Sequence, residues 1–502
     1  MSDLRKVKSN FAKRVGSLDT TLRDGEQTPG VTFSPQEKAT IALALKSYGV
    51  DIVEAGSAIN GESEREGIRK VCEAFGSNEN VTSFARIKNV DVDAVVEAGA
   101  GRISLVFPAS DLHISKKLKT DQEGGAKIIL QSLEYAKGRG LVVEMLAEDG
   151  SRADPDFLKR LSVACQEGGA ECFCVCDTLG VLNPFETHAL FEYLREGLDI
   201  GLSFHGHNDR RMAVANTLSA LEAGADRFHG TINGLGERCG NCSLETVALE
   251  LKLKHGIDTV DLKQTMEVSN LVAGLSGVRP ADSTAVVGTF AFLHDAGIHH
   301  DGLKKGFEMY EPYPPETVGR KHRLSLGKLS GGRSIEMKLL ELGLEVPQEK
   351  LPELVEAVKR MGEARQIVSD AHFHMLVEKV KGNGLHEKVK VEEVNVTTGN
   401  RGTPVATVHL RFNGDEELKF GAAPGDGPVD AALSAVSNAL GNDVNPELLS
   451  YDVAAIKGGT DAIVRLNLTV RLGDKKVNAS AMGTDIVLAS VDAYVKALNV
   501  LL

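Results

Sequence analysis

The sequence predicts a (β/α)8 (TIM) barrel followed by a helical linker region and a C-terminal α+β domain. Between residues 15 and 275, short apolar runs typical of strands alternate with amphipathic helical stretches. Alternation of this kind over about 250 residues is typical of a closed parallel barrel. Helices and charged loops follow, and β-type runs return from Val389. We therefore expect an N-terminal arm at 1–14, the barrel at 15–275, the linker region at 276–388 and the last domain at 389–502.

Eight strands are expected in the barrel segment, and several helices between them begin with favourable residues. Ser34, Asp154 and Asn183 each stand directly before a proline, an order that suits a helix N-terminus. A doubly wound sheet is the alternative, but it requires a glycine-rich phosphate-binding turn, which Asp19–Gln27 does not provide. The expected strands are Val15–Asp19, Val50–Ala55, Val81–Arg86, Arg102–Phe107, Leu141–Leu146, Cys172–Cys176, Leu202–His205 and Arg227–Ile232.

Beyond Val389 one pattern occurs twice in outline. Three strand-like runs precede a helical stretch at Pro428–Leu440, and three more precede another at Ile486–Leu498. This order predicts two βββα halves that share a core. The expected strands are Val394–Thr398, Pro404–Phe412, Leu418–Phe420, Tyr451–Ala455, Ala462–Leu472 and Lys476–Ser480.

Composition narrows the classes of partner and the compartment. The 502 residues have a net charge of −13, which argues against binding to nucleic acid or to an anionic membrane. No apolar run approaches about 18 residues and no signal peptide is recognisable, so we expect a cytoplasmic protein. Seven cysteines, an odd number, do not indicate a disulfide framework. Cys239 and Cys242 form a lone C-x-x-C pair that could be redox-active or bind zinc, although the neighbouring residues indicate another role for this loop.

Polar residues gather where the expected strands end. His205 and His207 follow an apolar run and project to the same side, as either a hydrogen-bonded pair or a clamp for a divalent metal ion. Active sites of barrel enzymes lie at the C-terminal ends of the strands. Polar or ionisable groups follow most of the expected strands, at Arg23, Asp24, Glu54, Glu144, Glu148, Asp177, Thr178, His205, His207 and Asn241. This convergence on one rim favours an active site with a mixed nitrogen and oxygen metal site.

Three motifs resemble those of the DRE-TIM metallolyases. They are Leu18–Gly30, containing Arg23-Asp24-Gly25-Glu26, then His205–Asp209, and Asn233–Asn241. Within that group the chain is similar to the Claisen-condensing branch, which comprises 2-isopropylmalate, citramalate and homocitrate synthases. The similarity extends from about residue 15 to the end of the chain.

The resemblance implies roles for ten residues. Arg23 would polarise a ketone, and Glu148, with Glu144 as a second candidate, would be the active-site glutamate. Thr178 would hold the substrate carboxylate, and Glu144 is also placed among the substrate-binding residues. His299 and Tyr310, after the barrel, would complete the catalytic set. The implied ligands of a divalent ion (Mn²⁺, Mg²⁺, Zn²⁺ or Co²⁺) are Asp24, His205, His207 and Asn241.

The implied reaction condenses the co-substrate acetyl-CoA with a 2-oxo acid. We prefer 2-oxoisovalerate, which makes the chain a 2-isopropylmalate synthase, with pyruvate and citramalate synthase as the alternative. Homocitrate synthase is disfavoured because Pro108–His113 lacks an arginine for a distal carboxylate. A non-catalytic amino-acid sensor is the remaining alternative, yet no implied ligand or base is missing. The resemblance further implies a homodimer and inhibition by leucine or isoleucine at the C-terminal domain.

Overall fold

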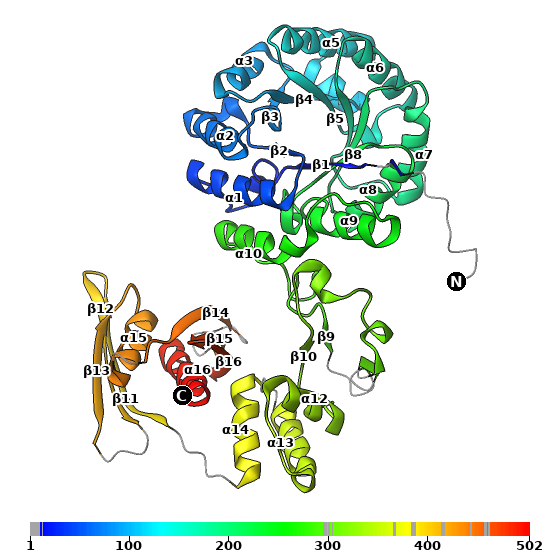
Figure 1. The fold of residues 1–502 in the computed structure, drawn as a ribbon. Helices are drawn as coiled ribbons and strands as arrows, with labels where there is room; N and C mark the ends of the chain where they lie inside the picture. Colours follow the sequence, from blue (N-terminus) through cyan, green and yellow to red (C-terminus); the bar gives the residue numbers. More distant parts are fainter. Residues whose placement is uncertain are drawn as a thin grey trace. The chain divides into compact units, whose positions relative to one another are not determined.

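The chain divides into two compact units (Figure 1). The first comprises Met1–Phe292 and Tyr313–Lys321, and the second comprises Leu293–Pro312 and His322–Leu502. The computed structural model describes residues 11–12, 14–294, 299, 302–303, 305–364, 368–382, 388–412, 417–441, 444–455, 459 and 462–502. Among these residues, no helix has the length and apolar character needed to cross a membrane.

The first unit is a closed barrel of eight parallel strands, which confirms the predicted fold class. Each strand pairs with the next along the chain, and β1 also pairs with β8 to close the barrel. The strands are β1 (Gly16–Asp19), β2 (Ile52–Glu54), β3 (Val81–Arg86), β4 (Arg102–Pro108), β5 (Val142–Glu148), β6 (Cys172–Asp177), β7 (Gly201–Gly206) and β8 (Arg227–Gly230).

Helices surround this barrel, and capping side chains fix where several of them begin. At the start of α1, Ser34 and Glu37 form a reciprocal capping box, and Asn183 and Glu186 do the same at α7. Such caps contribute about 1 kcal/mol each, which explains why the predicted starts match. The helices are α1 (Pro35–Tyr48), α2 (Glu62–Phe75), α3 (Asn89–Ala98), α4 (Asp111–His113), α5 (Gln122–Gly138), α6 (Pro155–Glu167), α7 (Pro184–Arg195), α8 (Ala213–Glu222), α9 (Leu244–Glu250) and α10 (Thr265–Ser276).

The segment after α10 continues to pack on the barrel. Val286, Val287, Phe292 and Val318 are buried in the same hydrophobic core as the barrel strands. The guanidinium of Arg320 donates to the carbonyl of Val286 at 2.9 Å. The four-part division with a boundary at residue 275 stays a prediction.

The second unit begins with a small helical region and ends with two similar halves. Its first part contains β9 (Leu293–His294), β10 (Arg323–Leu324), α12 (Gly332–Leu342), α13 (Leu351–Glu363) and α14 (Asp370–Lys381). Two three-stranded antiparallel sheets follow, each with one helix, which confirms the predicted βββα halves. They are β11 (Val389–Gly399), β12 (Gly402–Phe412), β13 (Lys419–Pro424) with α15 (Pro428–Leu440), and β14 (Glu447–Ala455), β15 (Val464–Leu472), β16 (Lys475–Gly483) with α16 (Ile486–Leu501). Buried residues of both halves form one hydrophobic core, as the sequence predicts.

Candidate active site

The side chains of Asp24, His205 and His207 meet at the C-terminal ends of the barrel strands. Asp24 stands at the start of the 3-10 helix η2 (Gly25–Gln27) after β1, His205 lies on β7, and His207 follows that strand. Nε2 of His205 lies 3.4 Å from Oδ2 of Asp24, and Nε2 of His207 lies 3.9 Å from the same oxygen. The two Nε2 atoms are 3.3 Å apart, so three potential ligand atoms surround one point.

The loop after β8 brings Asn241 to the same place. His207 and Asn241 form an isolated antiparallel β-bridge, and the amide of Cys242 donates to the carbonyl of Gly206 at 3.0 Å. Nδ2 of Asn241 donates to the carbonyl of Leu235 at 3.1 Å. Its Oδ1 has no hydrogen-bond partner among the described residues. The structure therefore brings together all four residues whose sequence motifs imply metal binding.

Burial and a nearby guanidinium set the protonation of this cluster. Burial alone would raise the pKa of Asp24, but Arg23 and His205 hold that pKa well below its usual value. Burial lowers the pKa of His205. Burial, together with the repulsion that a protonated His205 would exert, lowers the pKa of His207 to about 4. At neutral pH the cluster thus contains one carboxylate and two neutral imidazoles, the protonation states that bind metal ions.

The residues present fit a divalent metal ion. Oδ1 of Asp24 and Oδ1 of Asn241 are buried and lack hydrogen-bond partners within the described part of the chain. Buried polar atoms are normally satisfied, so two such oxygens in one cluster require an explanation. Two imidazole nitrogens, a carboxylate and an amide oxygen form a mixed ligand set suited to Mn²⁺, Zn²⁺, Co²⁺ or Mg²⁺. A divalent cation would satisfy both oxygens.

Two carboxylates and one aromatic ring hold Arg23 beside this cluster. Its Nη1 lies 2.9 Å from Oδ2 of Asp24, and its Nε lies 2.6 Å from Oε2 of Glu54 at the end of β2. The guanidinium carbon lies 4.5 Å from the centre of the Phe84 ring. Phe84 in turn packs, together with Val106, against a small buried cluster of Leu146, Cys174 and Cys176. A fixed positive charge therefore lies next to an apolar wall.

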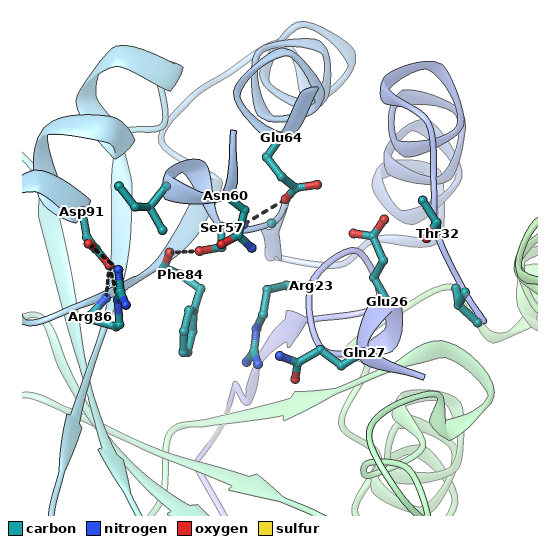
Figure 2. Close-up of a pocket in the computed structure, with 13 residues that line it drawn as sticks. Arg23, Glu26, Gln27, Thr32, Ser57, Asn60, Glu64, Phe84, Arg86 and Asp91 are labelled. Carbon is teal, nitrogen blue, oxygen red and sulfur yellow. Dashed lines mark hydrogen bonds and ion pairs between the residues drawn. The ribbon is translucent and has the colours of Figure 1, made fainter. Parts of the chain in front are cut away.

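A pocket of about 590 Å³ opens beside Arg23 (Figure 2). Figure 2 shows Arg23 between Phe84 and Gln27, with the Arg86–Asp91 ion pair at the edge of the view. The volume lies within the range of about 300–1,000 Å³ that is typical of small-molecule sites. The lining residues are Arg23, Glu26, Gln27, Val31, Thr32, Gly56, Ser57, Ile59, Asn60, Glu64, Phe84, Arg86 and Asp91.

Glu148 and Thr178 lie on neighbouring loops of the same rim. Glu148 ends β5, and Nζ of Lys117 contacts its two carboxylate oxygens at 2.5 and 2.6 Å. The hydroxyl of Thr178 accepts a hydrogen bond from the backbone amide of Asp149 at 2.8 Å. Asp149 has a φ of 61°, which is uncommon for a residue other than glycine. The ends of β5 and β6 are thus connected through Thr178.

Glu144 lies one layer deeper, inside the barrel. Its Oε1 accepts a hydrogen bond from Oγ of Ser203 at 2.6 Å. The same oxygen lies 3.0 Å from Nε2 of His229. Its Oε2 lies 3.2 Å from Nη1 of Arg227. The carboxylate is therefore fully engaged with interior partners, and the structure does not bring it together with Thr178 at the rim. Three residues lie between Glu144 and Glu148, and this spacing along β5 accounts for the difference in depth.

The second unit contains His299 and Tyr310, whose rings contact one another. The ring centroids lie 4.3 Å apart with an interplanar angle of 31°. The ring of His294, on β9, lies 5.8 Å from that of His299. The two residues that the resemblance pairs as catalytic are thus neighbours. His300, the next histidine along the chain, lies outside the described residues.

Two residues near the site, His229 and Arg238, were assigned no function from the sequence. His229, on β8, lies beneath the cluster, with its ring centroid 5.6 Å from that of His205. Its position could be found from strand alternation, because His229 faces the barrel interior together with Arg227. Arg238 belongs to the Asn233–Asn241 motif, but its contacts depend on a loop conformation that no local pattern indicates.

The chain is similar to known proteins over almost its entire length. Residues 14–272 match the family described as HMGL-like. Residues 286–366 match the homocitrate synthase post-HMGL domain-like family, and residues 367–502 match the LeuA allosteric (dimerisation) domain.

Three relatives align with nearly the whole chain. (R)-citramalate synthase CimA of Methanocaldococcus jannaschii is 43% identical over 486 residues, which cover 97% of this chain and 99% of that protein. A protein of Methanothermobacter thermautotrophicus, provisionally given the same name, is 42% identical over 97% of this chain and 98% of its own length. Another from Archaeoglobus fulgidus, also named provisionally, is 41% identical over 97% of this chain and 100% of its own length.

Proposed function

This chain belongs to the HMGL-like family, and we propose that it is an (R)-citramalate synthase, which condenses acetyl-CoA with pyruvate and releases CoA. The observation that carries the proposal is the 43% identity, over 97% of the chain, to the enzyme of that name from Methanocaldococcus jannaschii. The sequence alone favoured 2-oxoisovalerate. The relatives instead support pyruvate, which the sequence left open as the alternative.

The rim cluster supports a metal-assisted condensation. Asp24, His205, His207 and Asn241 are proposed to hold a divalent metal ion, which when bound supplies Lewis-acid chemistry to the ketone of the 2-oxo acid. Arg23 places a fixed positive charge where an alkoxide develops during addition to that ketone.

The condensation requires a base and a carbon nucleophile. We assign His299 as the base, assisted by Glu148, because imidazole is the most common general base at neutral pH. Removal of a proton from the methyl group of acetyl-CoA lets that carbon form a bond to the ketone carbon of pyruvate. Water then cleaves the thioester, which gives citramalate and CoA. The contact between the rings of Tyr310 and His299 supports a role for Tyr310 in orienting the base.

The surroundings of Arg23 suit these substrates. The pocket that Arg23 and Phe84 line has room for a small group such as the methyl of pyruvate. Thr178 is proposed to hold the carboxylate of the oxo acid. The pocket lined by Gln27, Ser57 and Asn60 offers polar partners for the amide groups of the acetyl-CoA arm.

The C-terminal domain is proposed to join two chains and to bind isoleucine. Residues 367–502 match a domain described as allosteric and as a dimerisation domain. An end product of branched-chain amino-acid synthesis is the expected effector of a citramalate synthase. We therefore propose a homodimer that isoleucine inhibits.

A thiol-release assay tests the proposed reaction. The purified chain, loaded with Mn²⁺, should release CoA from acetyl-CoA faster with pyruvate than with 2-oxoisovalerate, and EDTA should abolish this release. Asp24→Asn, which keeps the size of the side chain but removes the ligand charge, should lower the rate at least about 100-fold. Release of no thiol with either oxo acid would refute the enzyme proposal. Faster release with 2-oxoisovalerate would show that this oxo acid, and not pyruvate, is the preferred substrate.

A further inference from the structure

The loop from Asn233 to Asn241 has an unusual backbone. Gly234, Gly236 and Gly240 have positive φ angles of 66°, 155° and 87°. A Cβ atom at Gly236 would collide with the side-chain amide of Asn241, and one at Gly240 would collide with the carbonyl of Gly234. The loop therefore wraps tightly around Asn241, and only glycine permits this at both positions.

Arg238 has a left-handed backbone in the same loop although it is not glycine. Its φ is 57°, a conformation that costs about 1 kcal/mol for a residue with a Cβ. Such residues persist where surrounding contacts determine them. The contacts of the Arg238 side chain are therefore informative.

The guanidinium of Arg238 connects three loops of the rim. Its Nε and Nη2 donate to Oδ1 and Oδ2 of Asp209 at 2.9 and 3.0 Å. Nη2 also donates to the backbone carbonyl of Thr178 at 2.7 Å. Asp209 follows His207 by two positions, and Thr178 lies at the end of β6. The loops after β6, β7 and β8 are thus joined at one side chain.

This two-pronged geometry is specific to arginine. A planar guanidinium fits both oxygens of a carboxylate at once, whereas an ammonium group provides a single point of charge. The pairing with Asp209 fixes the distance between the loop that carries His207 and the loop that carries Asn241. The amide of Asn208 also donates to the carbonyl of Gly240 at 2.9 Å, so side chains and backbone connect the same two loops.

We propose that Arg238 is a positioning residue that holds Asn241 at the metal site and thereby sets the affinity for the divalent ion. The inference rests on the metal site of the proposed function, but not on the identity of the oxo acid. Residues that orient metal ligands typically change metal affinity by about 10- to 100-fold when they are replaced. Within the described part of the chain, the side chain of Arg238 forms no hydrogen bond or ion pair with any of the four proposed ligands, so it acts through the loops it joins.

A surface ion pair without this role would behave differently. The Arg238 side chain is 34% exposed, and exposed ion pairs contribute about 0–1 kcal/mol to stability. Its loss would then change the thermal midpoint slightly and leave metal affinity unchanged. The affinity for the metal ion, measured without substrate, therefore distinguishes a positioning role of Arg238 from a role in surface stability alone.

In the experiment, the full-length metal-free protein is titrated with Mn²⁺. Electron paramagnetic resonance measures the concentration of the free ion at each step. Arg238→Ala should raise the Kd for Mn²⁺ at least about 10-fold, and Asp209→Asn should raise it similarly. Arg238→Lys keeps the positive charge but loses the planar group that binds both carboxylate oxygens. Its Kd for Mn²⁺ should lie between those of Arg238→Ala and wild type. At saturating Mn²⁺ the turnover of these variants should recover towards the wild-type value.

Arg195→Ala is the matched control. Nη1 of Arg195 donates to Oδ2 of Asp226 at 2.9 Å, and its Nη2 donates to the carbonyl of Ile200 at 2.9 Å. It thus joins an aspartate and a carbonyl as Arg238 does, but Asp226 and Ile200 precede β8 and β7 at the opposite end of the barrel. The Kd of this variant for Mn²⁺ should equal that of wild type.

Two results would overturn the inference. A wild-type Kd for Mn²⁺ in folded Arg238→Ala would show that the ion pair only stabilises the surface. Equal increases of Kd in Arg195→Ala and Arg238→Ala would show a general effect of stability. Failure of the wild-type protein to bind Mn²⁺ would instead overturn the metal assignment itself, whereas Mn²⁺ binding without thiol release would affect only the proposed reaction.

Discussion

At the scale of single residues, Arg23 combines a fixed charge with a fixed position. Burial alone would lower its pKa, but Glu54 and Asp24 raise it, so the guanidinium stays charged. The two carboxylates hold the Nε and Nη1 edges of the guanidinium, and the ring of Phe84 lies against it at 4.5 Å. A cation stacked on an aromatic ring gains roughly 0.5–2 kcal/mol. Phe84 thus has two possible effects, one on the position of Arg23 and one on the space beside it.

Phe84→Ala separates these effects. We expect the ratio of kcat/KM for pyruvate to that for 2-oxoisovalerate to fall about 10-fold, because the removed ring leaves room for the larger side chain. Phe84→Leu should give a smaller change, and Phe185→Ala, at a side chain that is 86% exposed on α7, should give none. The measurement is thiol release with each oxo acid. Equal losses of kcat/KM with both substrates would contradict a role in specificity and would assign Phe84 to the positioning of Arg23 alone.

At the scale of elements, buried carboxylates join β1 to the loop before α9. Asp19, at the end of β1, accepts hydrogen bonds from the backbone amide and the hydroxyl of Thr21, both at 2.9 Å. The same hydroxyl accepts from the amide of Ile232 at 2.9 Å. Glu245, in the first turn of α9, accepts from the amide of Asn233 at 3.3 Å. The strand that precedes Asp24 and the loop that precedes Asn241 thus share one buried network.

This network should make stability depend on pH. Burial is the main cause that raises the pKa of Asp19 from 3.8 to about 7, and the charge of Glu245 adds to it. Because the folded pKa is higher, the stabilising contribution is fully present below about pH 4 and is lost as pH rises through 7. Between pH 5 and 8 wild type should lose about 2 kcal/mol more than Asp19→Asn, as measured by urea unfolding. Asp258→Asn, at a side chain that is 69% exposed, is the control.

An unchanged pH dependence in Asp19→Asn would contradict this assignment. Glu245→Gln provides an independent check, because burial also raises the pKa of Glu245 to about 7. Its replacement should reduce the pH dependence in the same direction. If either variant lost more stability than wild type between pH 5 and 8, the change in pH dependence would have the opposite sign. This result would exclude a raised pKa for the replaced carboxyl group.

The strands of the barrel were largely predictable from the sequence, whereas the depth of a side chain within the barrel was not. Alternating apolar runs predict all eight barrel strands, and the structure confirms them. Glu144 and Glu148 share one face of β5 by alternation, yet one lies among interior side chains and the other beside Lys117 at the rim. The height of a residue depends on the tilt and stagger of neighbouring strands, which no single strand encodes.

Loop contacts were equally difficult to predict. Asn241 could be assigned through a motif, because the motif carries the ligand itself. The contacts of Arg238 arise only when loops from β6, β7 and β8 meet, and they need a left-handed backbone that arginine rarely adopts. Local sequence preferences favour other conformations at that position. Side chains that act across three loops therefore need the folded structure to be recognised.

At the scale of the whole molecule, the residues proposed for catalysis belong to different units. Asp24, His205, His207 and Asn241 lie in the first unit, and His299 and Tyr310 lie in the second. The return of Tyr313–Lys321 to the first unit was not predicted, because the prolines around it leave no helical or strand periodicity to follow. Val318 is nevertheless fully buried in the barrel core. The residues that precede and follow the segment 293–312, which contains His299 and Tyr310, therefore belong to the first unit.

The proposed dimer allows a direct test of how these groups cooperate. Asp24→Asn and His299→Ala chains, each inactive alone, can be co-expressed with different tags and isolated as mixed dimers. If each active site takes His299 from the partner chain, one of the two sites in a mixed dimer contains both intact groups. Thiol release per dimer should then reach about half of the wild-type rate, as twofold symmetry requires. A mixed dimer as inactive as its parents, although folded and able to bind Mn²⁺, would contradict a shared site and would assign His299 to its own chain.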